Sequence, residues 1–255
     1  MVSYEEVAKA SRLKTLELVY KAQTSHIGSL FGCADIFAVL FEHINLEKDK
    51  FVLSAGWKAA MLYYHLWRKG KMTTEELDSY CMLGSKFIGL AEPVIPEIPF
   101  SGGSMGLGFP ASIGFALSKK LKNEEGHIYV LMSDGEQQCG TTWEAAAIAA
   151  HHKLDNLTVI VEINRFQAMG KTHDILKMAP LKDKWTNFGW DCIEVNGHNY
   201  PRLERAIQQT KGTKPFVVLA HTIKGRGVSS WENNNLWHYA QVKKEDFEYA
   251  QSCLN

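Results

Sequence analysis

HIYVLMSDGEQQCGTTWEAAAIAAHHKLDNLTVIVEINRF, residues 127–166, is the stretch of sequence that decides the fold. Its two apolar runs, 127–132 and 157–163, are typical of central strands of a parallel sheet, which are buried on both faces. The Ala-rich segment 143–150 between them is long enough to predict a crossover helix. A right-handed βαβ unit sets the carboxyl ends of its two strands side by side, at the sheet edge where ligands bind in open α/β proteins.

A polar side chain follows each of these predicted strands. Asp134 comes after the first strand and Asn164 directly after the second. Either residue alone favours a helix cap or a turn. Because the two predicted strands are adjacent, however, the carboxylate and the amide oxygen are expected to converge. Such hard oxygen ligands suit Mg²⁺ or Ca²⁺, which also bind diphosphate oxygens. The pair therefore predicts half of a metal–diphosphate cofactor site.

The rest of the chain predicts an α/β fold of doubly wound type, with a mostly parallel central sheet flanked by helices, in a single domain spanning residues 1–255. Proline-rich residues 84–100 are expected to be irregular, and residues 25–29 to form a polar turn. The remaining expected helices are 4–22, 35–43, 60–69, 201–209, 243–254 and one opened by Pro110, and the remaining strands are 51–54, 190–195 and 215–220.

Composition excludes several classes of partner. The chain has 28 basic and 28 acidic residues, so neither nucleic acid nor a membrane surface is an expected partner. No apolar run has the length of a membrane span, and we expect a cytoplasmic protein. The five cysteines are odd in number and widely spaced, which favours reduced thiols and resembles no zinc site.

Three further segments contain candidate residues. The glycine cluster 101–108, which includes Gly106, is either a plain loop or a turn that presents backbone N–H groups to phosphate. His26 and His238 lie in polar, turn-rich surroundings, where an isolated histidine is more often solvated than catalytic. Lys224 and Arg226 follow a predicted strand and either face an anion or, by default, are solvated.

The chain resembles the transketolase family. Asp134-Gly135-Glu136 followed thirty positions later by Asn164 is similar to the thiamine diphosphate motif. Four more blocks agree in order: SHIGSLFGCADIFAVLF, FVLSAG, SGGSMGLGFPASIGFAL and HTIKGRGVSSWENNNLWH. The resemblance covers nearly the whole chain and implies the separate N-terminal subunit of a split, two-subunit transketolase. It also implies the thiamine-diphosphate-binding fold.

The resemblance assigns roles to individual residues. It implies that Asp134, Asn164 and the carbonyl of Phe166 bind Mg²⁺ or Ca²⁺. Gly135 and Asn164 are expected to contact the diphosphate, and Gly106 to contribute to cofactor binding through its glycine cluster.

The resemblance also gives roles to the two histidines. His26 would lie near the thiazolium and the substrate oxygens, and His238 would contact both the diphosphate and the substrate. The reaction implied is transfer of a two-carbon unit from a ketose or 2-oxo acid to an aldehyde or ketone acceptor such as a sugar. In this chemistry the cofactor carries the reaction and the protein orients the reactants.

One part of the family's active site lies outside this sequence. In the family, a glutamate of a pyrimidine-binding domain activates the cofactor, and we expect no such domain after residue 255. The resemblance therefore implies a second subunit that carries the pyrimidine-binding and C-terminal domains, in an α2β2 heterotetramer. Helix 143–150 is expected to pack closely either at that subunit interface or on the sheet.

Four positions depart from the family pattern. Ser133 replaces the first glycine of the motif, and Cys139 replaces a glutamate that helps to couple two active sites. Trp57 stands where the family has a diphosphate-contacting histidine, and Leu90 where it has a histidine that contacts the donor's terminal hydroxyl. Because an unpaired buried hydroxyl costs about 1–3 kcal/mol, we expect a methyl-bearing donor such as pyruvate. The alternative is a non-catalytic or regulatory cofactor-binding subunit.

Overall fold

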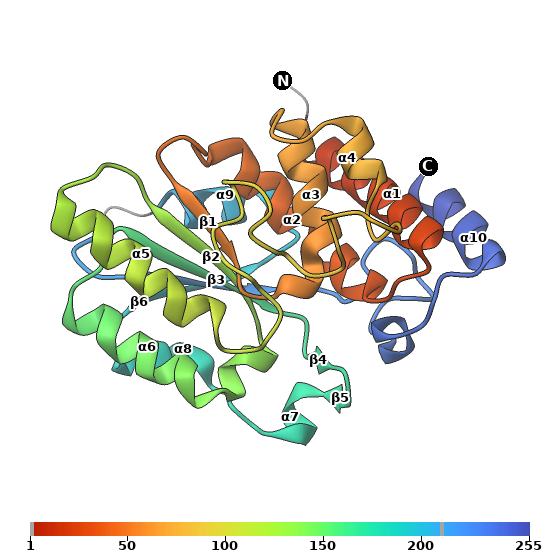
Figure 1. The fold of residues 1–255 in the computed structure, drawn as a ribbon. Helices are drawn as coiled ribbons and strands as arrows, with labels where there is room; N and C mark the ends of the chain where they lie inside the picture. Colours follow the sequence, from red (N-terminus) through yellow and green to blue (C-terminus); the bar gives the residue numbers. More distant parts are fainter. Residues whose placement is uncertain (1–2, 210–211) are drawn as a thin grey trace.

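The computed structural model describes residues 3–209 and 212–255, which fold around a five-stranded sheet (Figure 1). The strand order is β1-β2-β3-β7-β6, and every neighbouring pair is parallel. This confirms the predicted α/β class. The strands are β1 (Lys50–Leu53), β2 (Ile128–Ser133), β3 (Leu157–Ile163), β6 (Asp191–Asn196) and β7 (Phe216–His221).

Helices cover both faces of this sheet (Figure 1). Alternate residues of β3 divide between two hydrophobic clusters: Ile160 packs with one helical layer, and Val159 and Val161 pack with the other. The first layer is formed by α1 (Tyr4–Ala22), α2 (Ile27–His43), α3 (Ala59–Arg68) and α9 (Tyr200–Gln208), and the second by α5 (Gly108–Lys122), α6 (Gly140–His151) and α8 (Leu181–Asn187).

The predicted βαβ unit is confirmed. β2 and β3 pair in parallel, with Ser133 opposite Glu162, and α6 is the crossover between them. Helix α6 packs its small residues Ala145, Ala146 and Ala149 into the core beside the sheet, while Ile148 on its other face is 48% exposed. Packing on the sheet thus accounts for the Ala-rich face of α6, and an interface role for its other face stays a prediction.

Helix α2 begins earlier than the sequence predicted. We expected residues 25–29 to form a turn and a helix to start at residue 35, but α2 starts at Ile27. His26 immediately before it has a left-handed backbone (φ 72°) that ends the preceding turn. Because α2 is buried all round from Ile27 to Phe41, it lacks the amphipathic period by which helices are recognised.

The remaining elements are short or lie at the ends. The helix predicted for the C-terminal tail is α10 (Lys244–Leu254), and residues 84–100 contain no helix or strand, as expected. Within the described ranges, no helix combines the length and apolarity needed to cross a membrane. The short elements are α4 (Thr74–Asp78), α7 (Thr172–Ile175), the hairpin β4 (Phe166–Gln167) with β5 (Gly170–Lys171), and the 3₁₀ turns η1 (Gly56–Lys58), η2 (Gly135–Gln138) and η3 (Asn235–His238).

A buried ion pair lies at the carboxyl end of the central strand. Glu162 of β3 and Lys58 of η1 are both 0% exposed, and the ammonium of Lys58 donates to Oε2 of Glu162. Oε1 of the same carboxylate accepts from Oγ1 of Thr222 at 2.9 Å. Gly32 of α2 leaves room for this carboxylate, because a Cβ there would lie 2.6 Å from Oε1. Neither charge has access to water, so each depends on the other.

We expect Lys58→Met to destabilise the chain by about 3–5 kcal/mol, because it leaves the Glu162 carboxylate buried without a counter-charge. The double variant Lys58→Met/Glu162→Gln removes both charges and is expected to recover most of the loss. Urea unfolding of the chain measures both variants. Lys120→Met, which removes one partner of the exposed Lys120–Asp155 pair, is the control and should leave stability nearly unchanged. A double variant no more stable than the single one would contradict this account.

Candidate cofactor and active site

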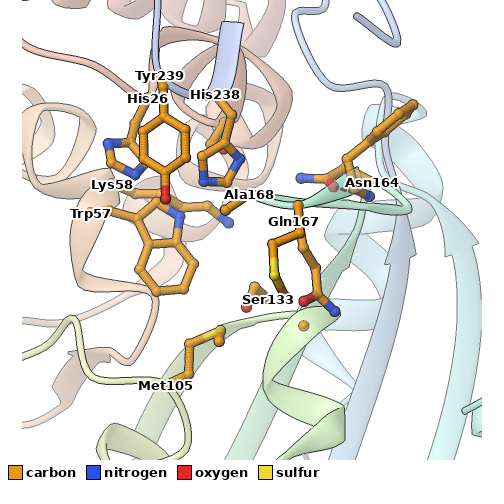
Figure 2. Close-up of a pocket in the computed structure, with 14 residues that line it drawn as sticks. His26, Trp57, Lys58, Met105, Ser133, Asn164, Gln167, Ala168, His238 and Tyr239 are labelled. Carbon is orange, nitrogen blue, oxygen red and sulfur yellow. Dashed lines mark hydrogen bonds between the residues drawn. The ribbon is translucent and has the colours of Figure 1, made fainter. Parts of the chain in front are cut away.

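A cavity of about 230 Å³ opens where β2 and β3 end (Figure 2). Trp57 lies with the two histidines on one side of it, and Asn164 lies opposite (Figure 2). Six of the residues predicted from the sequence line this cavity. They are His26, Trp57, Gly135, Asn164, Phe166 and His238. The structure thus brings together residues from the start of α2, from η1, from both strand ends and from η3.

Two predicted residues lie beside the cavity rather than in its lining. Asp134 lines a neighbouring cavity of about 360 Å³ together with Arg165 and Thr172. Gly106 adjoins the lining residue Met105 and has a positive φ of 77°, and a Cβ there would lie 2.6 Å from Cβ of Cys139. Only glycine fits that position without strain.

One oxygen of Asp134 has no hydrogen-bond partner among the described residues. Its Oδ2 accepts from the backbone N–H of Arg165 at 2.6 Å and from Oγ1 of Thr172 at 3.3 Å. Its Oδ1 is buried without a hydrogen bond to any described residue. Burial and the nearby Glu162 carboxylate raise the pKa of Asp134 to about 7. A buried, unpaired carboxylate oxygen is well suited to a cation, which would replace the missing donor.

The side-chain amide of Asn164 is held in one orientation. Its Oδ1 accepts from the backbone N–H of Phe166 at 2.9 Å, and its Nδ2 donates to Oε2 of Glu162 at 3.3 Å. A backbone N–H only donates and a carboxylate only accepts, so the two contacts fix which end of the amide is oxygen. The turn that makes this possible needs a left-handed residue, Arg165, with φ 67°. It then leads into the hairpin β4–β5 and brings Phe166 to the cavity.

The donor set fits a hard divalent cation. No group of three or more His, Cys, Asp or Glu residues in the described part of the chain is arranged to hold a metal. A cation here would therefore need amide and carbonyl oxygens besides a carboxylate, which is what Asp134, Asn164 and the carbonyl of Phe166 offer. Such all-oxygen sets are typical of Mg²⁺ and Ca²⁺.

The two predicted histidines meet at the cavity. The rings of His26 and His238 lie 5.0 Å apart at an angle of 61°, and the backbone N–H of His26 donates to the carbonyl of His238 at 3.0 Å. Burial and the charge of Lys224 lower the pKa of His26 to about 4. Burial, Lys224 and His26 lower the pKa of His238 to about 3. Both rings are therefore neutral near pH 7, and neither adds positive charge.

The sequence did not predict the burial of two lysines. Lys58 lines the cavity although no motif singled it out. Lys224 was expected to be solvated by default, but it is 0% exposed, and that default expectation is wrong. Arg226, in contrast, is exposed and pairs with Glu232 at 3.2 Å, as expected for a loop charge. Lys58 is the single charged residue in the apolar segment 57–64, and this position is the sequence feature that could have indicated its burial.

Leu90 does not line the cavity. Its side chain packs against Gly103, where a Cβ would lie 2.8 Å from Leu90 Cδ2, and it is 39% exposed. Trp57, in contrast, lines the cavity, with its ring 6.5 Å from that of His26. The expected change in donor preference therefore rests on Trp57.

Comparison with known proteins identifies the family. The family model described as "Transketolase, thiamine diphosphate binding domain" matches residues 3–254. An apulose-4-phosphate transketolase subunit of Phocaeicola vulgatus is 34% identical over 254 residues, covering 95% of this chain and 90% of that protein. The 6-deoxy-6-sulfo-D-fructose transketolase subunit SqwG of Clostridium sp. is 31% identical over 265 residues, covering 99% of this chain and 96% of that protein.

A solved structure and a longer sequence relative agree with this result. The crystal structure of transketolase from Campylobacter jejuni superposes with a TM-score of 0.92 and 28% identity, over 100% of this chain but 43% of that one. Human transketolase is 32% identical over 94% of this chain and 40% of its own length. The chain thus spans about two fifths of these longer transketolases. The family model and the relatives of 34% and 31% identity show that this chain belongs to the transketolase family, and it matches that family's thiamine diphosphate binding domain.

Proposed function

We propose that the chain is the N-terminal subunit of a two-subunit, thiamine-diphosphate-dependent transketolase, a transferase of aldehyde or ketone residues. The observation that carries the proposal is the unpaired Oδ1 of Asp134 beside the oriented amide of Asn164. Both stand at the carboxyl edge of the sheet, next to a cavity that holds His26 and His238. The bound cofactor supplies the carbanion chemistry that breaks and forms the carbon–carbon bond.

The residues of the chain bind and orient. Asp134, Asn164 and the carbonyl of Phe166 would hold the divalent cation, Mg²⁺ or Ca²⁺, which would bind the diphosphate. Gly135 and Gly106 belong to the backbone that faces the diphosphate. Trp57 closes the cavity wall beside His26 and excludes water from that side.

The two histidines contribute hydrogen bonds rather than charge, because both are neutral near pH 7. His26 would hydrogen-bond to the substrate oxygens next to the reacting carbon. His238 would hydrogen-bond to both the diphosphate and the substrate.

A partner subunit completes the site in this proposal. Both split-enzyme relatives named above are called subunits, and the chain spans 43% of the C. jejuni transketolase. Apolar side chains exposed at the cavity support a covering partner: Met105 is 47% exposed, Met169 80% and Tyr239 63%. We propose that this partner carries the pyrimidine-binding and C-terminal domains and that the assembly is an α2β2 heterotetramer. The five unpaired cysteines support a reducing, cytoplasmic setting.

Two classes of donor are candidates. A ketose is favoured by the relatives, whose names give apulose-4-phosphate and 6-deoxy-6-sulfo-D-fructose. A 2-oxo acid such as pyruvate is favoured by Trp57, which places an indole where the family has an imidazole. The indole ring offers a single donor and no acceptor, so this wall of the cavity is less polar than with the family's diphosphate-contacting imidazole, and it suits a methyl-bearing donor better than a hydroxymethyl one. In either case the acceptor is an aldehyde or ketone such as a sugar.

We expect Asp134→Asn to weaken cation-dependent binding of thiamine diphosphate at least ~100-fold in the reconstituted two-subunit complex, because a neutral amide replaces the anionic ligand. Calorimetric titration measures the affinity without relying on turnover. Asp155→Asn, at an exposed aspartate that pairs with Lys120, is the matched control and should bind normally. Unchanged affinity of Asp134→Asn would contradict the proposed cation site.

Donor preference is measured with the same complex. If Trp57 selects against a hydroxymethyl group, kcat/KM for pyruvate should exceed that for a ketose phosphate, and Trp57→His should shift the ratio toward the ketose by roughly 10-fold or more. Trp67→His, at a half-buried tryptophan outside the cavity lining, is the control. A clear preference of the unmodified complex for the ketose would exclude the pyruvate donor. Cofactor binding without carboligation from either donor would instead support the non-catalytic alternative.

A further inference from the structure

Lys224 is a buried lysine whose ammonium contacts two uncharged groups. It follows β7 and is 0% exposed. Its Nζ lies 2.8 Å from Oδ1 of Asn235 and 2.8 Å from Nδ1 of His238. No carboxylate forms an ion pair with it in the part of the chain that the structure describes. Burying a cation with only neutral partners costs free energy. This cost indicates that the contacts of Lys224 have a role other than stability.

The contact with His238 determines where the proton of that ring lies. A lysine ammonium has three donors and no acceptor, so Nδ1 of His238 must present its lone pair to Lys224. In a neutral imidazole the other nitrogen, Nε2, then carries the hydrogen. We infer that Lys224 is a positioning residue that holds His238 as the Nε2–H tautomer, so that the ring offers the cavity a hydrogen-bond donor and not a base.

The position of Lys224 is itself fixed on three sides. Its methylene stem packs on Gly28 of α2, where a Cβ would lie 3.3 Å from Cε and Cγ of the lysine. The backbone N–H of Gly225 donates to the carbonyl of Gly28 at 2.8 Å. Asn235, which accepts from Nζ, donates through its own Nδ2 to the carbonyl of Ala168 at 3.2 Å. The ammonium therefore has little freedom to leave Nδ1 of His238.

The positive charges around His238 also disfavour a proton on its Nδ1. The rings of His26 and Tyr239 pack edge-on against it, 5.0 and 4.9 Å away, and Lys58 and Trp57 line the same cavity. A proton on Nδ1 would meet the ammonium of Lys224 and the nearby charge of Lys58. Burial lowers the pKa of Lys224 to about 8, so the lysine is charged below that pH, including at neutrality.

His26 provides a contrast within the same site. Its Nδ1 lies 2.8 Å from Oγ of Ser25, and a hydroxyl both donates and accepts. The chain therefore leaves the tautomer of His26 open while it determines that of His238. If the proposed function holds, on which this consequence rests, His238 donates to a diphosphate or substrate oxygen, and any proton transfer by a histidine falls to His26.

The test is a measurement of the tautomer in the chain labelled with ¹⁵N-histidine, without cofactor, near pH 7. Long-range ¹H–¹⁵N spectra distinguish the two ring nitrogens, and His238→Gln assigns the signals. We expect His238 to be predominantly Nε2–H. Lys224→Met should lower the ratio of Nε2–H to Nδ1–H roughly tenfold or more, the factor that a charge-assisted hydrogen bond supplies.

Two further variants separate positioning from a structural role. Lys224→Arg keeps a cationic, donor-only group and should restore the Nε2–H tautomer. Lys71→Met, which removes a half-buried lysine paired with Glu97 at 3.4 Å, should leave His238 unchanged. An Nδ1–H tautomer in the unmodified chain, or an unchanged ratio in a folded Lys224→Met, would overturn the inference. Because no cofactor is present, the outcome is independent of the Asp134→Asn binding test.

Discussion

The burial of one carboxylate at the end of the central strand constrains most of the site. Glu162 has no contact with water and its oxygens accept from three side chains: Lys58, Thr222 and Asn164. These three come from the turn after β1, the segment after β7 and the end of β3. One carboxylate therefore links the segments that follow three strands, and it accepts from Nδ2 of Asn164, which leaves the amide oxygen to accept from the backbone N–H of Phe166. The packing at this edge of the sheet and the orientation of the Asn164 amide depend on a single group.

The elements predicted correctly from the sequence are those with a regular pattern of burial along their length. β2 and β3 were predicted nearly to the residue, because both strands are buried along their whole length and read as continuous apolar runs. Helix α1 was predicted at its observed bounds, Tyr4–Ala22, because its apolar residues recur at helical spacing. The start of α2 was missed because a helix buried on all sides has no period. The hairpin β4–β5 was missed because two-residue strands leave no pattern.

The residues of the site likewise fall into those that the sequence predicted and those that it did not. Asp134 and Asn164 were accessible to reasoning from residues alone, because strand ends in a βαβ unit converge by topology. His26 and His238 lie near opposite ends of the chain, and spacing gives no sign that they meet. Their polar, turn-rich surroundings marked them as candidates, but only the family resemblance placed them in one site. The burial of Lys58 and Lys224 was not predicted for a different reason: a lysine is nearly always exposed, and only tertiary packing shows that these two are buried.

The charges left unbalanced at this edge of the sheet define what the site lacks. Lys58 is neutralised by Glu162, whereas Lys224 is held by two neutral groups and Asp134 keeps one oxygen without a partner among the described residues. A ligand that is only anionic would satisfy Lys224 and repel Asp134, and a cation alone would do the reverse. A divalent cation bound to a diphosphate would balance both charges, because the cation would pair with the carboxylate while the anionic oxygens would lie in the cavity beside His238, the ring that Lys224 contacts. The arrangement therefore fits the metal complex of the cofactor better than either component alone.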